Sequence, residues 1–150
     1  MKISTKGRYG LRAMMDIAMH AQSGGPVFLS DIVKRQDISA KYLEQIFSTL
    51  HGAGLVNTVR GRRGGYLLTR PPDAIRLKDI ITVLEGPCAL VDCVTNQEVC
   101  PRAEKCAARD VWSLLSRKVD EFLSGLTLAD LVQMQNQKTQ DKTRASMYDI

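Results

Sequence analysis

The most constraining feature of the sequence is the stretch of residues 38–66, in which four short patterns follow one another in a fixed order. Apolar residues at helical spacing come first and end at Gly54. A run rich in β-branched residues follows over residues 55–59. A turn built from arginines and glycines then leads into a second short apolar run at residues 66–68. This order predicts a helix followed by a β-hairpin with a basic tip.

Two earlier helical patterns extend this stretch to a predicted helix-turn-helix. Apolar residues recur at helical spacing over residues 5–22, and a shorter helix is predicted over residues 30–36. After a turn at Asp37, Ser39 is a suitable N-cap for the third helix. The third helix has an apolar face for a core and a polar face for solvent or DNA. Its apolar face carries Leu43, Ile46, Phe47 and Leu50.

Three arginines lie at or beside the tip of the predicted hairpin. Concentrating like charge on a small loop costs electrostatic free energy, which a polyanion would relieve. The net charge of +5 points the same way, although a solvated tip without a partner is the alternative. We therefore predict a winged helix-turn-helix that binds double-stranded DNA. The residues expected to contact DNA are Thr5, Lys6, Ser39, Lys41, Tyr42, Glu44, Gln45, Arg60, Arg62 and Arg63.

The expected contacts differ in what they recognise. The arginines, Lys41 and the turn at residues 5–6 are expected to bind phosphates or the minor groove. Phosphates could also meet the free N–H groups at the start of the first helix. Ser39, Tyr42, Glu44 and Gln45 are expected to face base edges. Because phosphates repel a carboxylate, Glu44 is expected to accept from cytosine N4 or to exclude wrong bases, and so to set selectivity.

The predicted fold class is mainly α with a small β-hairpin. A helix over residues 77–84 completes a DNA-binding domain over residues 1–86. Residues 87–102 show no periodicity and form a cysteine-rich loop. The pattern becomes helical again from residue 103.

Residues 103–134 are predicted to contain a long helix over 103–124 with a broad apolar stripe, and a short closing helix. Helix-turn-helix proteins commonly pair across a two-fold axis, so we expect the long helix to form a homodimer. Folding back onto its own domain is the alternative. Residues 135–150 are polar and are predicted to be a flexible tail.

All four cysteines lie between residues 88 and 106, separated by four, six and five residues. In a chain without a recognisable signal peptide, such clustering favours metal, cluster or redox chemistry over structural disulfides. Structural zinc sites usually contain closely spaced ligand pairs, and only the first gap here is short enough. Three thiols in an irregular loop before a helix suit an iron–sulfur cluster better. A zinc site and unligated redox thiols stay open as alternatives.

Over about residues 1–134 the chain resembles the Rrf family of bacterial winged-helix regulators. The resemblance rests on the opening STKGRYGLRAMMDIA, the helix SAKYLEQIF, the wing VRGRRGGYLL and the three-cysteine loop. It is strongest to the iron–sulfur cluster regulators of that family, where the residue matching Glu44 helps to choose between site classes. It implies a homodimeric transcription factor, expected to be a repressor. It also implies a [2Fe-2S] cluster held by Cys93, Cys100 and Cys106, which would alter DNA binding.

The sequence departs from the family pattern at the fourth cluster ligand. The cluster regulators have a histidine three residues after the last cysteine, and Arg109 stands there. Arginine cannot ligate because it stays protonated. Cys88, Asp92, a carboxylate of the other subunit or an outside ligand could serve instead, and Cys88 could equally be only packed. Some family members bind no cluster, including the cysteine-metabolism repressors, so the isolated protein could hold no cofactor.

The last three residues, Tyr148, Asp149 and Ile150, resemble the tail by which serine acetyltransferase enters cysteine synthase. Cysteine-metabolism repressors of the family bind that enzyme. The tail is therefore a candidate segment for binding cysteine synthase, with a solvated end as the alternative.

Other function classes have less support. The two histidines, His20 and His51, stand in helical patterns away from any nucleophile motif, so an enzyme is not expected. An electron-transfer protein would explain the cysteines but not the arginine-rich hairpin. No apolar run is long enough to cross a membrane and no signal peptide is recognisable, so we expect a cytoplasmic protein.

Overall fold

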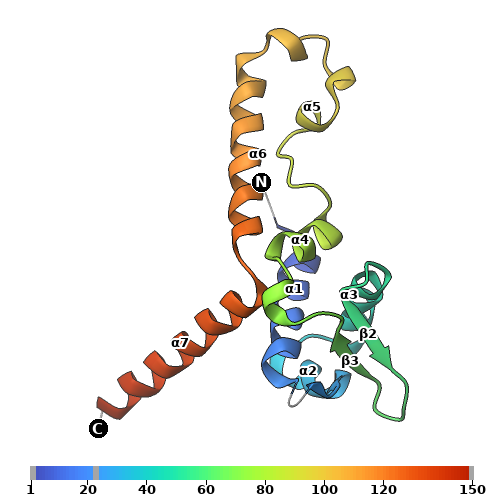
Figure 1. The fold of residues 1–150 in the computed structure, drawn as a ribbon, viewed down its shortest axis with the longest axis vertical. Helices are drawn as coiled ribbons and strands as arrows, with labels where there is room; N and C mark the ends of the chain where they lie inside the picture. The colour runs from blue at the N-terminus through green and yellow to red at the C-terminus, as the bar shows by residue number, and fades with distance from the viewer. Residues whose placement is uncertain (1–2, 22–23, 149–150) are drawn as a thin grey trace.

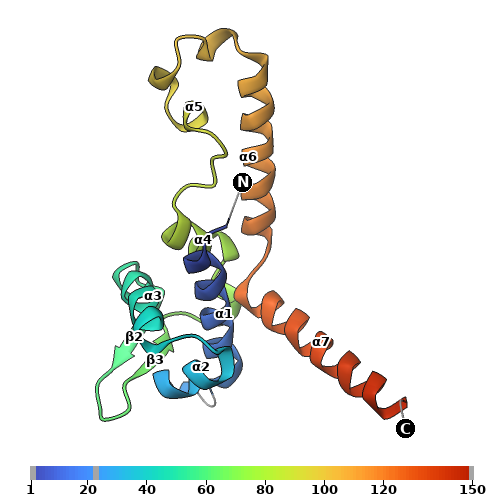
Figure 2. The same cartoon turned by 180° about the vertical axis from the view of Figure 1, so that it is seen from behind.

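The computed structural model describes residues 3–21 and 24–148 as a helical body with two projections (Figure 1). One projection consists of α6 and the cysteine loop, and the other is α7 (Figure 2). The body contains α1 (Thr5–His20), β1 (Val27–Phe28), α2 (Leu29–Gln36), α3 (Ala40–Gly52), β2 (Val56–Val59), β3 (Gly65–Leu68) and α4 (Leu77–Glu85). The projections contain α5 (Asp92–Thr95), two 3-10 turns (Gln97–Val99 and Ala103–Lys105), α6 (Ala107–Gly125) and α7 (Leu128–Tyr148).

The predicted helix-turn-helix is confirmed by α2 and α3. The α2 helix ends at Gln36, and the left-handed backbone of its C-cap residue, Asp37 (φ 53°), turns the chain toward α3. Ser39 is the N-cap of α3, and its side chain accepts a hydrogen bond from the Tyr42 amide at 3.3 Å. The cap satisfies a free N–H group at the start of α3 and fixes where the helix begins.

The hydrophobic core lies among α1, α3, α4 and the sheet. The predicted inner face of α3 is buried as expected, and Phe47 stacks on Tyr66 with ring centroids 4.0 Å apart. Complete burial of a side chain of this size contributes roughly 2–3 kcal/mol of hydrophobic stabilisation. The core side chains with no exposed surface include Met14, Ile17, Ile32, Leu43, Ile46, Phe47, Leu50, Ile75, Ile80 and Leu128.

The β-sheet has three strands in the order β1-β3-β2, so the predicted two-stranded hairpin is incomplete. The added strand β1 pairs antiparallel to β3, with Val27 opposite Tyr66 and Phe28 opposite Gly65. A side chain on Gly65 would press on Pro26 and on the Val27 carbonyl, so glycine allows the strands to approach. Two residues are too few to show an alternating pattern, which is why the sequence did not reveal β1.

The C-terminal region differs from the prediction at both ends. The long helix begins at Ala107, after a 3-10 turn, rather than at residue 103. The closing helix was expected to end near residue 134, with a flexible tail after it, but α7 continues to Tyr148. Residues 135–148 contain no glycine or proline and several strong helix formers, which explains the longer helix. Asp149 and Ile150 lie outside the described residues.

The start of α7 is fixed to the body. Thr127 and Asp130 form a capping box, in which the Asp130 carboxylate accepts from the Thr127 amide at 2.8 Å. On either side, the Leu77 amide donates to the Leu126 carbonyl and the Leu128 amide to the Ile75 carbonyl, both at 2.9 Å. The α6–α7 junction is thereby held against the start of α4. Within the described residues, no helix is long and apolar enough to cross a membrane.

Candidate DNA-binding surface and cysteine loop

The outer face of α3 is exposed beside the hairpin formed by β2 and β3 (Figure 1). Lys41, Glu44 and Gln45 are exposed on this face, as a reading helix requires. Tyr42 is half-buried because its ring meets the edge of the Tyr9 ring at 6.0 Å. Ser39 is exposed, although its hydroxyl already caps α3. The structure thus brings these five predicted residues together at one helix.

The tip of the hairpin presents its three arginines to solvent. Gly64 has a left-handed backbone (φ 50°), and its carbonyl accepts from the Leu29 amide at 3.2 Å, which fixes the turn to the start of α2. The Arg63 guanidinium lies over the Phe28 ring at 5.1 Å from its centroid. This cation–π contact gives Arg63 a part in holding the tip, whereas no such contact involves Arg60 or Arg62 among the described residues.

A carboxylate lies close to this basic surface. Glu44 lies near Tyr66 on β3: burial first, and then the negative charge of Glu44, raise the pKa of the Tyr66 hydroxyl. An exposed carboxylate at the junction of α3 and the sheet would repel a passing phosphate. Its place is therefore compatible with a contact to a base rather than to the backbone of DNA.

The start of α1 makes hydrogen bonds within the protein that the sequence did not indicate. Thr5 and Lys6 form its first turn, but the Gly7 amide already donates to the Ser4 hydroxyl at 3.1 Å. The Glu85 carboxylate accepts from the Ser4 amide at 3.2 Å and from the Ser4 hydroxyl. The Ser4 hydrogen bonds hold the pKa of Glu85 below its usual value. The Ser4 and Gly7 amides at this helix start therefore already have protein partners, and a phosphate contact to the first turn of α1 stays a prediction.

The four cysteines are free and half-buried. Among the described residues, which include all four, no group of three or more Cys, His, Asp or Glu side chains lies close enough to hold a metal ion. The donor chemistry suits an iron–sulfur cluster, because thiolates are its usual ligands. The loop does not gather Cys93, Cys100 and Cys106 as it stands. Binding a cluster would require the loop to close further.

Two side chains of α6 hold the backbone of the loop. The Arg109 guanidinium donates through Nε to the Cys93 carbonyl at 2.8 Å, and the Ser116 hydroxyl accepts from the Leu90 amide at 3.2 Å. Ser116 is the buried residue of α6. The residue that replaces the expected histidine ligand therefore anchors the backbone of a cysteine.

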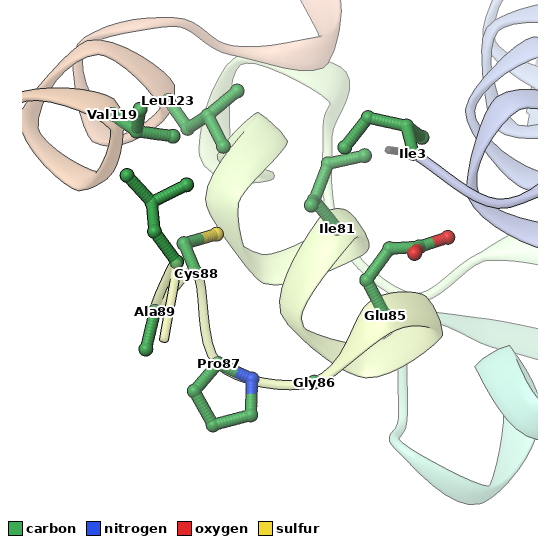
Figure 3. Close-up of a pocket in the computed structure, with 10 residues that line it drawn as sticks. Ile3, Ile81, Glu85, Gly86, Pro87, Cys88, Ala89, Val119 and Leu123 are labelled. Carbon is green, nitrogen blue, oxygen red and sulfur yellow. The ribbon is translucent and has the colours of Figure 1, made fainter. Parts of the chain in front are cut away.

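Cys88 lies apart from this anchor, in a cavity of about 250 Å³ between the end of α4 and α6 (Figure 3). The walls of the cavity include Ile81, Val119 and Leu123. Burial, followed by the nearby charge of Asp120, raises the pKa of the Cys88 thiol. Arg109, which contacts Cys93, and Val119, which lines the cavity with Cys88, stand ten positions apart on α6, or about 15 Å along the helix. Cys88 thus lies half-buried at the base of the loop, and its part as a cluster ligand stays a prediction.

The predicted apolar stripe of α6 is exposed. It projects from the body rather than folding back onto it (Figure 2), so the alternative of self-packing is wrong for most of the helix. Phe122 is 67% exposed and Trp112 is 41% exposed. Only the end of the stripe, at Leu126, packs against the core, together with the neighbouring Leu123. Val111 and Leu115 of the stripe are exposed as well, and Leu114 beside them adds to the exposed apolar surface.

Comparison with known proteins assigns the family. Residues 3–134 match the Rrf2 family, which is described as "Iron-dependent Transcriptional regulator". The chain belongs to the Rrf2 family of transcriptional regulators. It is 44% identical to the "HTH-type transcriptional regulator IscR" of Erwinia tasmaniensis, over 90% of this chain and 81% of that protein. These relatives are regulators rather than enzymes, as expected.

Two solved structures of Rrf2 proteins are similar in fold to this chain. One is CymR, the global cysteine regulator of B. subtilis, with a TM-score of 0.76 and 42% identity over 89% of this chain and 98% of that one. The other is T. potens IscR, with a TM-score of 0.72 and 41% identity over 90% of this chain and 88% of that one. The near-equal identities do not separate the cysteine-regulator type from the IscR type.

Several contacts of this Rrf2 chain had no signal in the sequence. The partners Glu85 and Ser4 stand 81 residues apart. The buried Asp16 carboxylate binds Arg35 at 2.6 Å and Gln36 at 2.7 Å, which joins α1 to α2. Long-range polar pairs of this kind follow from the fold rather than from a local pattern. An acidic residue on the apolar side of a predicted helix, as at Asp16, was the one available hint.

Proposed function

We propose that this Rrf2 protein is a sequence-specific, homodimeric DNA-binding repressor whose DNA binding responds to its cysteine loop. The observation that carries the proposal is the exposed polar face of α3 beside an arginine-rich wing. Two adjoining elements that differ in shape and charge suit the major groove and the flanking backbone or minor groove of a duplex.

The proposed contacts divide into affinity and selectivity. Arg60 and Arg62 would bind phosphates or the minor groove, because both are exposed at the tip. Arg63 would share that role while its stacking on Phe28 steadies the wing. Lys41 and the first turn of α1 would add contacts to the phosphates of the DNA backbone. Glu44 and Gln45 would meet base edges, with Glu44 rejecting sites that offer no donor.

The dimer is proposed from the exposed stripe of α6. Contiguous apolar surface is costly in water and commonly marks a protein interface. A second copy of the same helix would cover the stripe and would place two α3 helices on one duplex. Two α3 helices on one duplex predict an operator with two related half-sites.

The cysteine loop is proposed to be the sensing element. Cys93, Cys100 and Cys106 would hold a [2Fe-2S] cluster, with a fourth ligand from outside this set. Such a cluster supplies a redox- and iron-sensitive group. Support comes from the thiol donor set and from the similarity to proteins named IscR. A zinc site or clusterless thiols would give a regulator of the same architecture with a different signal.

Binding to cysteine synthase gains no support. The proposed segment, Tyr148 to Ile150, was expected at the end of a mobile tail, but α7 is helical to Tyr148. The similarity to CymR bears on the family and not on that partner.

Selection of duplexes from a random library tests the DNA-binding proposal. Purified protein should enrich one sequence class with two related half-sites. The Arg62→Ala variant should enrich the same class more weakly, while Glu44→Ala should enrich a broader class. Failure of the wild-type protein to enrich any sequence would overturn the proposal.

Anaerobic purification tests the sensing proposal. A brown protein with visible absorption, lost in Cys100→Ala and retained in Cys88→Ala, is the expected result. A colourless protein that holds one zinc ion per chain would favour the zinc alternative and contradict the cluster.

A further inference from the structure

The end of α4 is tied to the start of α1 by one side chain. Glu85 is the last residue of α4, and its carboxylate accepts from both the amide and the hydroxyl of Ser4. Ser4 in turn caps α1 by accepting from the Gly7 amide. A residue at the base of the cysteine loop therefore holds the first turn of a helix that begins 80 residues earlier in the sequence, at Thr5.

The last turn of α4 fits closely against α1 because two glycines face it. A methyl group on Gly7 would overlap the Glu85 carboxylate, and one on Gly10 would overlap the Leu84 side chain. Both glycines are buried within α1. Close-packed interiors transmit displacements rather than absorb them. A shift of Leu84 and Glu85 would therefore move the start of α1.

The contact continues from α1 to the reading helix. Tyr9, between the two glycines, meets the Tyr42 ring edge-on at a centroid distance of 6.0 Å. A methyl group on Gly10 would also lie 3.3 Å from Ile46, in the core-facing side of α3. One short segment of α1 thus contacts both the end of α4 and two residues of α3.

On its other side, Glu85 borders the cysteine loop. Gly86 and Pro87 connect it directly to Cys88, and all four residues line the cavity of about 250 Å³ against α6 (Figure 3). Ile3, which precedes Ser4, lines the same cavity. The cavity leaves this connection less tightly packed than the α1–α4 contact, so the loop can move here without opening the core.

We propose that Glu85 is the positioning residue through which the state of the Cys88–Cys106 loop controls the DNA-reading helices. The proposal rests on the DNA-binding function proposed above. Closure or modification of the loop pulls on Gly86 and Pro87, Glu85 moves with them, and the first turns of α1 and α3 follow. Glu85 itself is not among the residues placed at the DNA.

Four variants test this role. Glu85→Ala removes the carboxylate, and Gly7→Ala displaces it from the α1 side while leaving Glu85 in place. Glu85→Gln keeps an oxygen that can accept from Ser4 and removes the charge. Glu98→Ala, at an exposed glutamate in the loop, is the matched control.

The affinity for a selected duplex is measured for each protein before and after alkylation with N-ethylmaleimide, which modifies only this loop because it holds every cysteine. We expect alkylation to change wild-type affinity about tenfold or more, within the usual range for coupled sites. The change should fall below about twofold in Glu85→Ala and Gly7→Ala. It should persist in Glu85→Gln and in the control. Thermal unfolding confirms that each protein is folded.

The outcomes separate this proposal from the proposed function. If the wild-type protein selects no duplex, the DNA-binding function fails first. If it binds DNA but alkylation leaves the affinity unchanged, control by the loop is overturned while DNA binding stands. If alkylation changes the DNA affinity of Glu85→Ala and Gly7→Ala as much as that of the wild-type protein, Glu85 does not couple the loop to the DNA-reading helices. Should Glu85→Ala fail to fold, Gly7→Ala and Glu85→Gln decide between these results.

Discussion

The DNA-binding body and the α6 projection are stabilised by different kinds of contact. The body buries a continuous apolar core that includes Phe47, whereas α6 buries Ser116 and leaves most of its large apolar side chains exposed. Polar contacts, from Arg109, Ser116 and Asp120, connect α6 to the loop and to α4. The body is therefore stabilised mainly by burial of apolar side chains, whereas most of α6 is held by a few polar contacts and leaves its apolar stripe uncovered in one chain.

The largest expected effect is a loss of stability of the body. Phe47→Ala should lower the free energy of unfolding by about 3–5 kcal/mol, because it empties a site with no exposed surface. Urea unfolding should show this loss at every protein concentration. Phe122→Ala is the control: its effect should depend on protein concentration, since Phe122 is exposed in one chain. Equal, concentration-independent losses would contradict the comparison.

A charge in the middle of the α6 stripe should break the dimer and leave the body folded. Leu115→Asp would bury a carboxylate at the proposed interface, which should weaken dimerisation by about 100-fold or more. Sedimentation equilibrium measures the association, and circular dichroism checks the helices. An unchanged dimer would show that another surface pairs the chains.

The buried ion pair of the body should matter more than the exposed ion pair of the projection. Asp16 has no exposed side-chain surface, and Asp16→Asn should cost about 2 kcal/mol, less than for a fully buried pair because Arg35 is 32% exposed. The hydrogen bond to Asp16 raises the pKa of Arg35, so the guanidinium stays charged over the working pH range. Asp120→Asn, which removes an exposed partner of Lys78, should have a smaller effect. A larger loss of stability in Asp120→Asn than in Asp16→Asn, measured by urea unfolding, would contradict this difference between the two ion pairs.

The smallest expected effects separate affinity from selectivity within the DNA-binding surface. Arg62→Ala should weaken all duplexes alike and lower the salt slope by about one. Glu44→Ala should keep the affinity for the preferred duplex and lose about 1–3 kcal/mol of discrimination between bases. Titrations over single-base variants measure both. A change in one base preference for Arg62→Ala would contradict its backbone role.

The sequence predicted the parts of the molecule that local patterns determine. The helices of the body follow from apolar spacing and from caps such as Ser39, and the hairpin follows from its glycines and β-branched run. The two-residue β1 strand is too short for a pattern to emerge. The polar composition of residues 135–148 predicts disorder, but their several strong helix formers and the lack of glycine and proline let α7 continue.

Parts of the candidate site depend on the whole fold and were beyond prediction. Nothing near Glu85 in the sequence indicates Ser4 as its partner, and nothing near Arg109 indicates the Cys93 carbonyl. The residues predicted on α3 and the wing are exposed, apart from the half-buried Tyr42, and their roles stay predictions. The cysteine ligand set also stays a prediction, because the loop does not gather the thiols in this state.

DNA binding by the wing and α3 is tested most directly by one titration. Wild-type protein and the Arg60→Ala/Arg62→Ala double variant are titrated against the selected duplex and a scrambled duplex over a range of salt concentrations. The wild-type protein should prefer the selected duplex by about 10³-fold or more. The double variant should bind both duplexes more weakly, with a salt slope smaller by about two. A wild-type protein without preference, or a double variant with an unchanged slope, would contradict the proposed reading surface.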